Sequence, residues 1–144
     1  MWQLKQFSEL TADELFDIMK ARIDVFVVEQ KRIYPEADEL DRTALHLFNY
    51  VDHQLVAYAR IFPKGDYVTF GRVLTTSAVR GSGYGAQLVT EILQIIQQRF
   101  PNRPIQIDAQ THAQEFYQRF GFTPVGDIFT FNHTPHIRMD HNAL

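Results

Sequence analysis

Apolar and polar positions alternate along much of this chain, and the alternation predicts strands separated by three helices. Period-two spacing marks strands at residues 2–7, 44–51 and 55–62. Three further features predict four more strands: β-branched and aromatic residues at 67–75, a short apolar run at 105–109, and a closing hairpin of residues 123–131 and 135–139. Short polar turns join the second, third and fourth stretches, so these strands are expected to form an antiparallel meander. The fourth and fifth enclose a helix, and such a unit crosses over to pair in parallel. We therefore predict an α+β fold, with a mixed, mostly antiparallel sheet flanked by helices, in a single domain spanning residues 1–144.

The first helix is predicted to begin at Ala12, because residues 11–14 have the spacing of a capping box. Its apolar stripe contains one charge, Arg22, for which two interpretations stay open: a side chain that reaches solvent along its aliphatic stem, or a functional one. The β-branched run at residues 25–28 favours extended chain, so the helix is expected to end there. The acidic stretch at residues 31–41 is expected to be irregular, with one helical turn. Most such stretches are solvated, and the alternative is a rim that attracts a substrate.

The two later helices are bounded by glycine and proline. One is predicted from Gly83 to about Arg99, before the turn at residues 101–104. The other is predicted to start from a second capping box at residues 111–114 and to end with Gly121 in the C′ position. Its inward stripe consists of Ala113, Phe116, Tyr117 and Phe120.

Three glycines within five positions separate the fourth strand from the second helix. A glycine loop that opens a helix leaves the first backbone N–H groups unpaired, and these groups make an anion site. Arg80 adds a guanidinium suited to phosphate oxygens. A P-loop is excluded because Ala86 and Gln87 follow the last glycine, where lysine and a hydroxyl residue are needed. A dinucleotide fingerprint is excluded by the glycine spacing and by the missing acidic residue downstream.

Composition narrows the class of protein. The formal net charge is −3 and no basic stripe occurs, which argues against a nucleic-acid-binding protein. Zero cysteines exclude disulfides, cysteine-ligated metals and a thiol nucleophile. His133, His136 and His141 lie in the closing hairpin with a proline between them, and we expect no metal there. With no apolar run of about 18 residues and no leader pattern, the chain is expected to be cytoplasmic, with no membrane partner.

Two motifs in the expected order indicate a family. Residues 80–85, Arg-Gly-Ser-Gly-Tyr-Gly, resemble the acyl-CoA loop of the GNAT superfamily of N-acetyltransferases, and Ala113-x-x-Phe116-Tyr117-x-x-x-Gly121-Phe122 is similar to its other signature. Further blocks resemble the ElaA-like group within that superfamily: residues 22–30, the acidic segment ending at Asp41, His46, and residues 57–60, 71–73 and 109–112. The resemblance covers nearly the whole chain and implies a GNAT-like acyl-CoA N-acyltransferase fold.

The resemblance also implies how acetyl-CoA is held. Its pyrophosphate would lie on the loop and helix start, at Arg80, Gly81, Ser82, Gly83, Tyr84, Gly85 and Ala86. Its pantetheine arm would pair with the backbone of Val73, Leu74 and Thr75, and an N–H near Val73 or Leu74 would hold the thioester oxygen. Gln110 stands where other members carry an asparagine that reaches the cofactor.

Tyr117 corresponds to a tyrosine that the family places beside the coenzyme A sulfur, where it would act as general acid; the alternative is that it only fills the core. For the general base, Glu29 is the first candidate, His46 the second and His112 the third, and a bound water is a further choice. On the acceptor side, the resemblance implies contacts from Arg22, Phe26, Glu29, Gln30 and His112.

The sequence therefore predicts an acetyl-CoA-dependent N-acetyltransferase. Because there is no cysteine, direct attack by the amine in a ternary complex is the simpler route. The acceptor is a small-molecule or a peptide amine, and a homodimer stays open. Two alternatives remain: a non-catalytic acyl-CoA-binding sensor or scaffold, and an enzyme like the acyl-homoserine-lactone synthases, which share the Arg-x-x-Val-Phe pattern at residues 22–26.

Overall fold

The computed structural model describes all 144 residues and contains one seven-stranded sheet in the order β1-β2-β3-β4-β5-β7-β6. Its strands are β1 (Trp2–Gln6), β2 (Leu45–Val51), β3 (Gln54–Lys64), β4 (Tyr67–Thr75), β5 (Ile105–Gln110), β6 (Thr123–Phe131) and β7 (Thr134–His141). Only β4 and β5 run parallel, and every other neighbouring pair is antiparallel. The predicted mixed sheet is confirmed, with each strand within two residues of its expected bounds.

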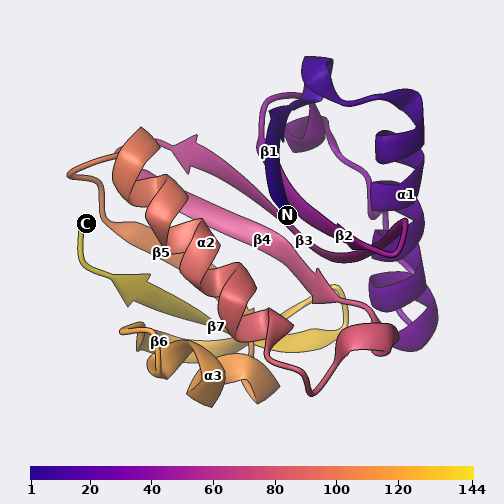
Figure 1. Cartoon of the computed structure of the whole chain (residues 1–144). Coiled ribbons are helices and arrows are strands. Elements are labelled where there is room, and N and C mark those ends of the chain that lie inside the picture. Colours follow the sequence, from indigo (N-terminus) through magenta and orange to yellow (C-terminus); the bar gives the residue numbers. More distant parts are fainter.

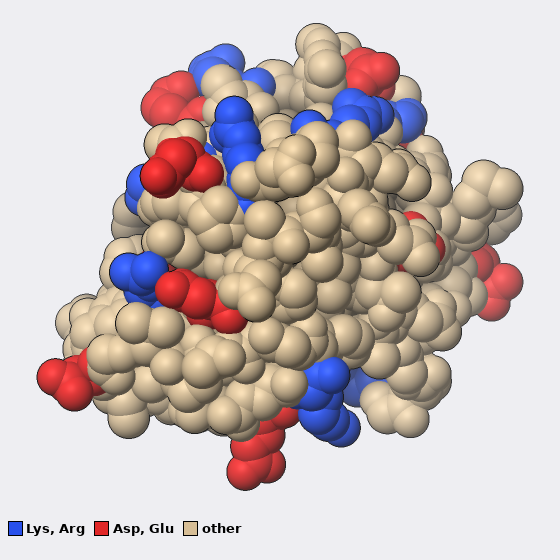
Figure 2. Space-filling view, turned by 90° about the vertical axis from the view of Figure 1, so that its left-hand side faces the viewer, with Lys and Arg blue, Asp and Glu red and all other residues tan.

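Three α-helices accompany the sheet: α1 (Ala12–Arg22), α2 (Tyr84–Arg99) and α3 (Gln114–Gln118). Figure 1 shows α2 lying across β4 and β5, with α3 below it beside β6 and β7 and α1 at the other end of the molecule, next to β2. None of these helices combines the length and the apolar character needed to cross a membrane. On the face shown in Figure 2, lysine and arginine side chains occur singly or in small groups interspersed with acidic ones.

Successive side chains of the central strands contribute to two separate hydrophobic cores, which lie on opposite faces of the sheet. Leu47 and Ala57 pack on the side that carries α2, whereas their neighbours Phe48 and Tyr58 pack with Ile18 of α1. Successive side chains of a strand point to opposite faces, so one strand can serve both cores. Both faces of β2 and β3 are therefore covered, whereas on β4 buried residues alternate with partly exposed ones.

The start of α1 is as predicted, but its end is not. The Glu14 N–H donates to Thr11 Oγ1 at 3.0 Å and the Thr11 N–H to Glu14 Oε1 at 2.9 Å, which closes the capping box. The helix then continues as a π-helix over Ile23–Glu29. Burying Val25 or Phe26 stabilises the fold by about 1.5–3 kcal/mol each. A β-branched residue costs a helix only about 0.7 kcal/mol, so tertiary packing outweighs the local preference.

Two other local predictions are corrected. The acidic stretch does contain one helical turn, the 3-10 segment Glu39–Arg42, yet Glu36 and Asp41 are buried where solvated side chains were expected. The capping box at residues 111–114 does not form, because Thr111–Ala113 is itself a 3-10 turn and α3 begins after it without a side-chain cap. At the other end of α3, Gly121 has a φ of +92°, the left-handed conformation expected of it.

Candidate active site

The sheet splits between β4 and β5. One register pair, Val68 with Ile105, joins these strands near their starts, and beyond it they run on without pairing. A bulge on β4 gives Arg72 a φ of +51° and leaves it and Val73 without register partners on β3. The diverging strands border a cavity of about 480 Å³ that reaches Val73 on one side and Gln110 on the other. The backbone that was predicted to hold a pantetheine arm therefore lies at an open edge inside the sheet.

Tyr117 lines this cavity. Its ring packs against Phe70, Phe116 and Phe122, with centroids 6.1, 5.2 and 5.8 Å away, and the residue is only 8% exposed. Burial raises the pKa of the Tyr117 hydroxyl, because the phenolate form loses its hydration. The hydroxyl therefore keeps its proton at neutral pH and can act as a donor.

The glycine loop has the geometry of an anion site. Gly81 and Gly83 adopt φ angles of +83° and +87°, which side-chain-bearing residues rarely adopt, and an added Cβ at either would meet no protein atom within 4 Å. Gly83 is the N-cap of α2 and supplies no side-chain hydrogen bond, and the first turn of α2 holds no acidic residue. Unpaired N–H groups and the helix dipole therefore face open space, which fits the pyrophosphate of coenzyme A.

Arg80 is held beside this loop by Glu29. The Arg80 Nη2 lies 2.8 Å from Glu29 Oε1, and its Nε donates to the Thr75 carbonyl at 3.1 Å. Glu29 borders a second hollow, shared with Asp17 and Asp24, and does not line the cavity that contains Tyr117. Glu29, the first candidate for the general base, is thus paired with Arg80 of the glycine loop and does not face Tyr117.

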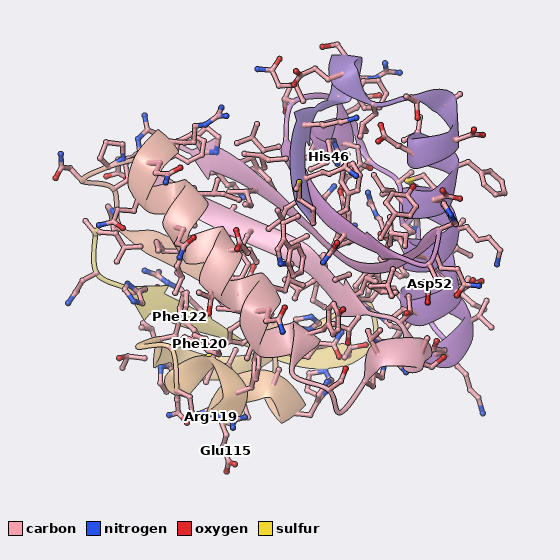
Figure 3. The ribbon with its side chains drawn as sticks, viewed as in Figure 1. His46, Asp52, Glu115, Arg119, Phe120 and Phe122 are labelled. Atoms are coloured by element: carbon pink, nitrogen blue, oxygen red, sulfur yellow. The ribbon has the colours of Figure 1, made fainter.

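His46, the second candidate, has a structural position. It is 1% exposed; its Nε2–H donates to the Asp41 carbonyl at 2.8 Å, and its Nδ1 accepts from the Tyr58 hydroxyl at 2.6 Å. Burial lowers the pKa of His46, so the ring stays neutral. Figure 3 shows His46 beside β2, well away from α3, where Glu115 and Arg119 point outwards. Neither ring nitrogen is left to take a proton from an acceptor, which corrects the sequence-based assignment.

Arg22 also lies outside the site. It is 0% exposed, with Nε 2.7 Å from Glu36 Oε2 and Nη1 2.6 Å from Asp41 Oδ1. Its Nη2 donates to the Glu36 carbonyl at 2.8 Å. The Arg22 guanidinium therefore does not reach solvent and does not line the cavity. Arg22 is a member of a buried ion pair, and neither of the two interpretations of its sequence position applies.

The remaining acceptor-side candidates do meet at the cavity. Phe26, Gln30 and His112 line it together with Gln110. Gln110 Nε2 donates to Gln30 Oε1 at 3.1 Å, so the amide at the end of β5 is held by the segment after the π-helix. Fixed in this way, the Gln110 amide faces the same cavity as Tyr117.

Sequence reasoning missed three buried or half-buried residues that line this cavity: Arg32, Tyr34 and His136. Arg32 lies 4.4 Å above the Tyr34 ring. His136 is 6% exposed, and its Nδ1–H donates to the Thr134 carbonyl at 2.8 Å. Arg32 meets the β6–β7 turn 100 positions further along the chain, so no spacing in the sequence could have indicated the contact.

A split sheet, an uncapped glycine loop opening a helix and a buried tyrosine beside the split define an acyl-CoA-dependent N-acyltransferase. The chain belongs to the GNAT acetyltransferase family, because the sequence profile of the acetyltransferase (GNAT) domain matches residues 12–143. It is 38% identical to the protein ElaA of Escherichia coli over 99% of this chain and 97% of that one. A UPF0039 protein of Synechocystis is 43% identical, over 96% of this chain and 92% of its own length.

Solved structures agree. An acyl-CoA N-acyltransferase from Pseudomonas aeruginosa superposes with a TM-score of 0.93 at 38% identity, covering 98% of both chains. The crystal structure of E. coli ElaA also gives 0.93, at 37% identity and 99% coverage of both. The acyl-homoserine-lactone synthase LasI gives 0.80 at 13% identity, covering 99% of this chain and 89% of LasI, and this likeness extends to the fold alone.

Proposed function

We propose that this protein transfers an acetyl group from acetyl-CoA to an amine, by direct attack of the amine in a ternary complex. The observation that carries the proposal is the split between β4 and β5. Tyr117 lines the cavity at this split, and β4, which borders it, leads into the glycine loop. A protein that only binds acyl-CoA would need the glycine loop and the split between the strands. The buried, protonated Tyr117 hydroxyl in the same cavity favours an enzyme, because it can donate a proton to the leaving group.

Binding is assigned to backbone and loop. The N–H groups at the start of α2 and the Arg80 guanidinium hold the phosphates, and the free edge of Val73, Leu74 and Thr75 aligns the arm. An N–H near Val73 or Leu74 stabilises negative charge on the carbonyl oxygen. Acetyl-CoA, when bound, supplies the thioester carbon that the amine attacks.

Tyr117 serves as the general acid. Its hydroxyl proton passes to the sulfur as the carbon–sulfur bond breaks, which avoids release of a free thiolate. The aromatic packing around its ring fixes the hydroxyl with little loss of side-chain entropy on binding.

For the general base, His136 fits better than the three residues considered from sequence. Because the Thr134 carbonyl accepts the proton on Nδ1, the lone pair of the neutral ring lies on Nε2. His136 lines the Tyr117 cavity, whereas Glu29 would first have to leave Arg80. His112, which is exposed at the cavity rim, and a bound water remain as the other routes for the proton.

The test uses the absence of cysteine. Since the chain has no thiol, coenzyme A released from acetyl-CoA can be measured with a thiol reagent without background from the protein. Release that depends on added amine, across a panel of polyamines, amino acids and short peptides, supports the proposal. Tight acetyl-CoA binding without release over the whole panel would favour the sensor alternative. Acyl-homoserine lactones in lipid extracts of an expressing host would favour the synthase alternative.

A further inference from the structure

Arg32 is a buried cation without a counter-ion. It is 7% exposed, yet its nearest polar partners are neutral oxygens: the Asn132 carbonyl, 3.4 Å from Nε, and Gln30 Oε1, 3.3 Å from Nη1. Its guanidinium lies over the Tyr34 ring. These bonds are long, and no carboxylate lies within 4.0 Å of Arg32.

The other arginines around the site are all paired. Arg60 lies 2.6 Å from Asp38, Arg72 lies 2.7 Å from Glu36, and Arg138 lies 2.9 Å from Asp140. Arg22, the third buried arginine besides Arg32 and Arg60, has two carboxylates. Of the three buried arginines, only Arg32 therefore lacks a carboxylate partner.

The chain offers Arg32 no carboxylate from within the cavity. Asp38 is already shared by Arg60 and Arg72. Asp108 also lines the cavity, but it is exposed on β5 and no ion pair joins it to Arg32. Phosphates are not the partner either, since none of the loop residues 80–86 lines this cavity.

A buried, unpaired charge is costly, and a planar guanidinium fork matches a carboxylate. The partner is therefore expected to arrive with the substrate. Gln30 holds the guanidinium in place, since its Oε1 accepts from both Arg32 and Gln110, and Gln110 ends β5 in the acyl-transfer cavity. Resting on the proposed function, we propose that Arg32 binds a carboxylate of the acceptor, so that the acceptor is an amine that also carries a carboxylate, such as an amino acid. Polyamines and internal lysines of proteins lack that group beside the amine.

The test compares matched acceptors. Each of the common amino acids and its α-carboxamide is offered with acetyl-CoA, and kcat/KM is measured from coenzyme A release. The acids are expected to exceed their amides at least tenfold. Arg32→Gln is expected to lower kcat/KM for the acids by about 10- to 100-fold, mainly through KM, while the amides change less than threefold. Arg42→Gln, an exposed arginine that pairs with Glu39 and does not line the cavity, is the control and leaves both unchanged.

The outcomes separate the two proposals. Equal turnover of acids and amides by the wild type overturns the inference and leaves the acetyltransferase proposal intact; this comparison needs no variant to fold. If no amine releases coenzyme A, the proposed function fails. The assignment of Arg32 to carboxylate binding is then tested by measuring the binding of amino acids. Amino acids should then raise the Tm of the wild type but not of Arg32→Gln, and equal shifts overturn it. A carboxylate could also enter on the acyl group, so Arg32-dependent turnover of succinyl-CoA with no preference among acceptors overturns the assignment to the acceptor.

Discussion

Arg22 and Glu36 form an ion pair inside the protein, with Nε and Oε2 2.7 Å apart and the two side chains 0% and 4% exposed. The same Glu36 oxygen lies 2.7 Å from Arg72 Nε on β4, and the other accepts a hydrogen bond from the Tyr34 hydroxyl. One carboxylate thus ties α1 and β4 to the segment that carries Arg32. Tyr34 and Arg72 of this cluster also line the cavity, so the buried ion pairs hold part of the cavity wall in place.

Replacing Arg22 should strongly destabilise the protein. Arg22→Met leaves Glu36 and Asp41 buried with fewer partners, and breaking a buried pair in this way costs about 3–5 kcal/mol. The free energy of unfolding from urea titrations should fall by that amount. Arg42→Met removes an exposed pair with Glu39 and should cost under about 1 kcal/mol. Similar losses for both would contradict the buried cluster.

His46 should make stability depend on pH. Burial lowers its folded-state pKa, so below about pH 6.5 the unfolded chain binds a proton that the folded ring refuses. The free energy of unfolding is therefore expected to be full above this pH and to fall as the pH drops from 6.5 towards 5. His46→Gln removes this contribution, and its unfolding free energy should vary less over that range. Parallel pH curves for the two proteins would refute the buried neutral state.

Tyr117→Phe keeps the ring that packs against Phe70 and Phe122 but removes the proton donor. We expect kcat to fall by about 100-fold, within the usual range for general acid catalysis, while acetyl-CoA affinity and stability stay near wild type. Tyr67→Phe, at the joined end of the same cavity, is the matched control and should keep its kcat. Unchanged turnover in Tyr117→Phe would leave that residue a packing role only.

Gly83→Ala should weaken acetyl-CoA binding. The position has a φ of +87°, so a side chain there strains the loop by about 1–2 kcal/mol and turns the first N–H groups of α2 away from the phosphates. Isothermal titration should give a Kd at least tenfold higher. Gly65→Ala imposes a comparable strain in the β3–β4 turn, at a φ of +61°, and should leave the Kd unchanged. Equal affinities for the two variants would argue against the loop as the phosphate site.

His136→Gln should lower kcat/KM. If Nε2 takes the amine proton, the glutamine amide cannot replace it as a base, and kcat/KM should fall by about 100-fold, within the usual range for general acid–base catalysis. His53→Gln, in the exposed β2–β3 turn, should keep the wild-type kcat/KM. Should Glu29→Gln lower kcat/KM while His136→Gln leaves it unchanged, the base would be Glu29.

Local patterns were sufficient for the sheet, the loop and the family. Apolar and polar residues alternate along a strand that has one buried face, so such a strand can be recognised from the sequence. The positive φ angles of the glycine loop can be expected from the glycines themselves. The signatures at residues 80–85 and 113–122 are each read within a single short segment, so the donor side of the site could be predicted.

The acceptor side depended on contacts between distant segments. Nothing local separates Glu36, which is buried by Arg22 and Arg72, from Glu39, which is solvated, because burial is decided by what packs above each carboxylate. The π-helix, the pairing of Glu29 with Arg80 and the meeting of Arg32 with the β6–β7 turn have the same origin. The sequence by itself determined the fold and predicted an anion site at the glycine loop. Only tertiary packing decided which charges are neutralised within the chain, because it brings carboxylates to Arg22 and Arg60 and none to Arg32.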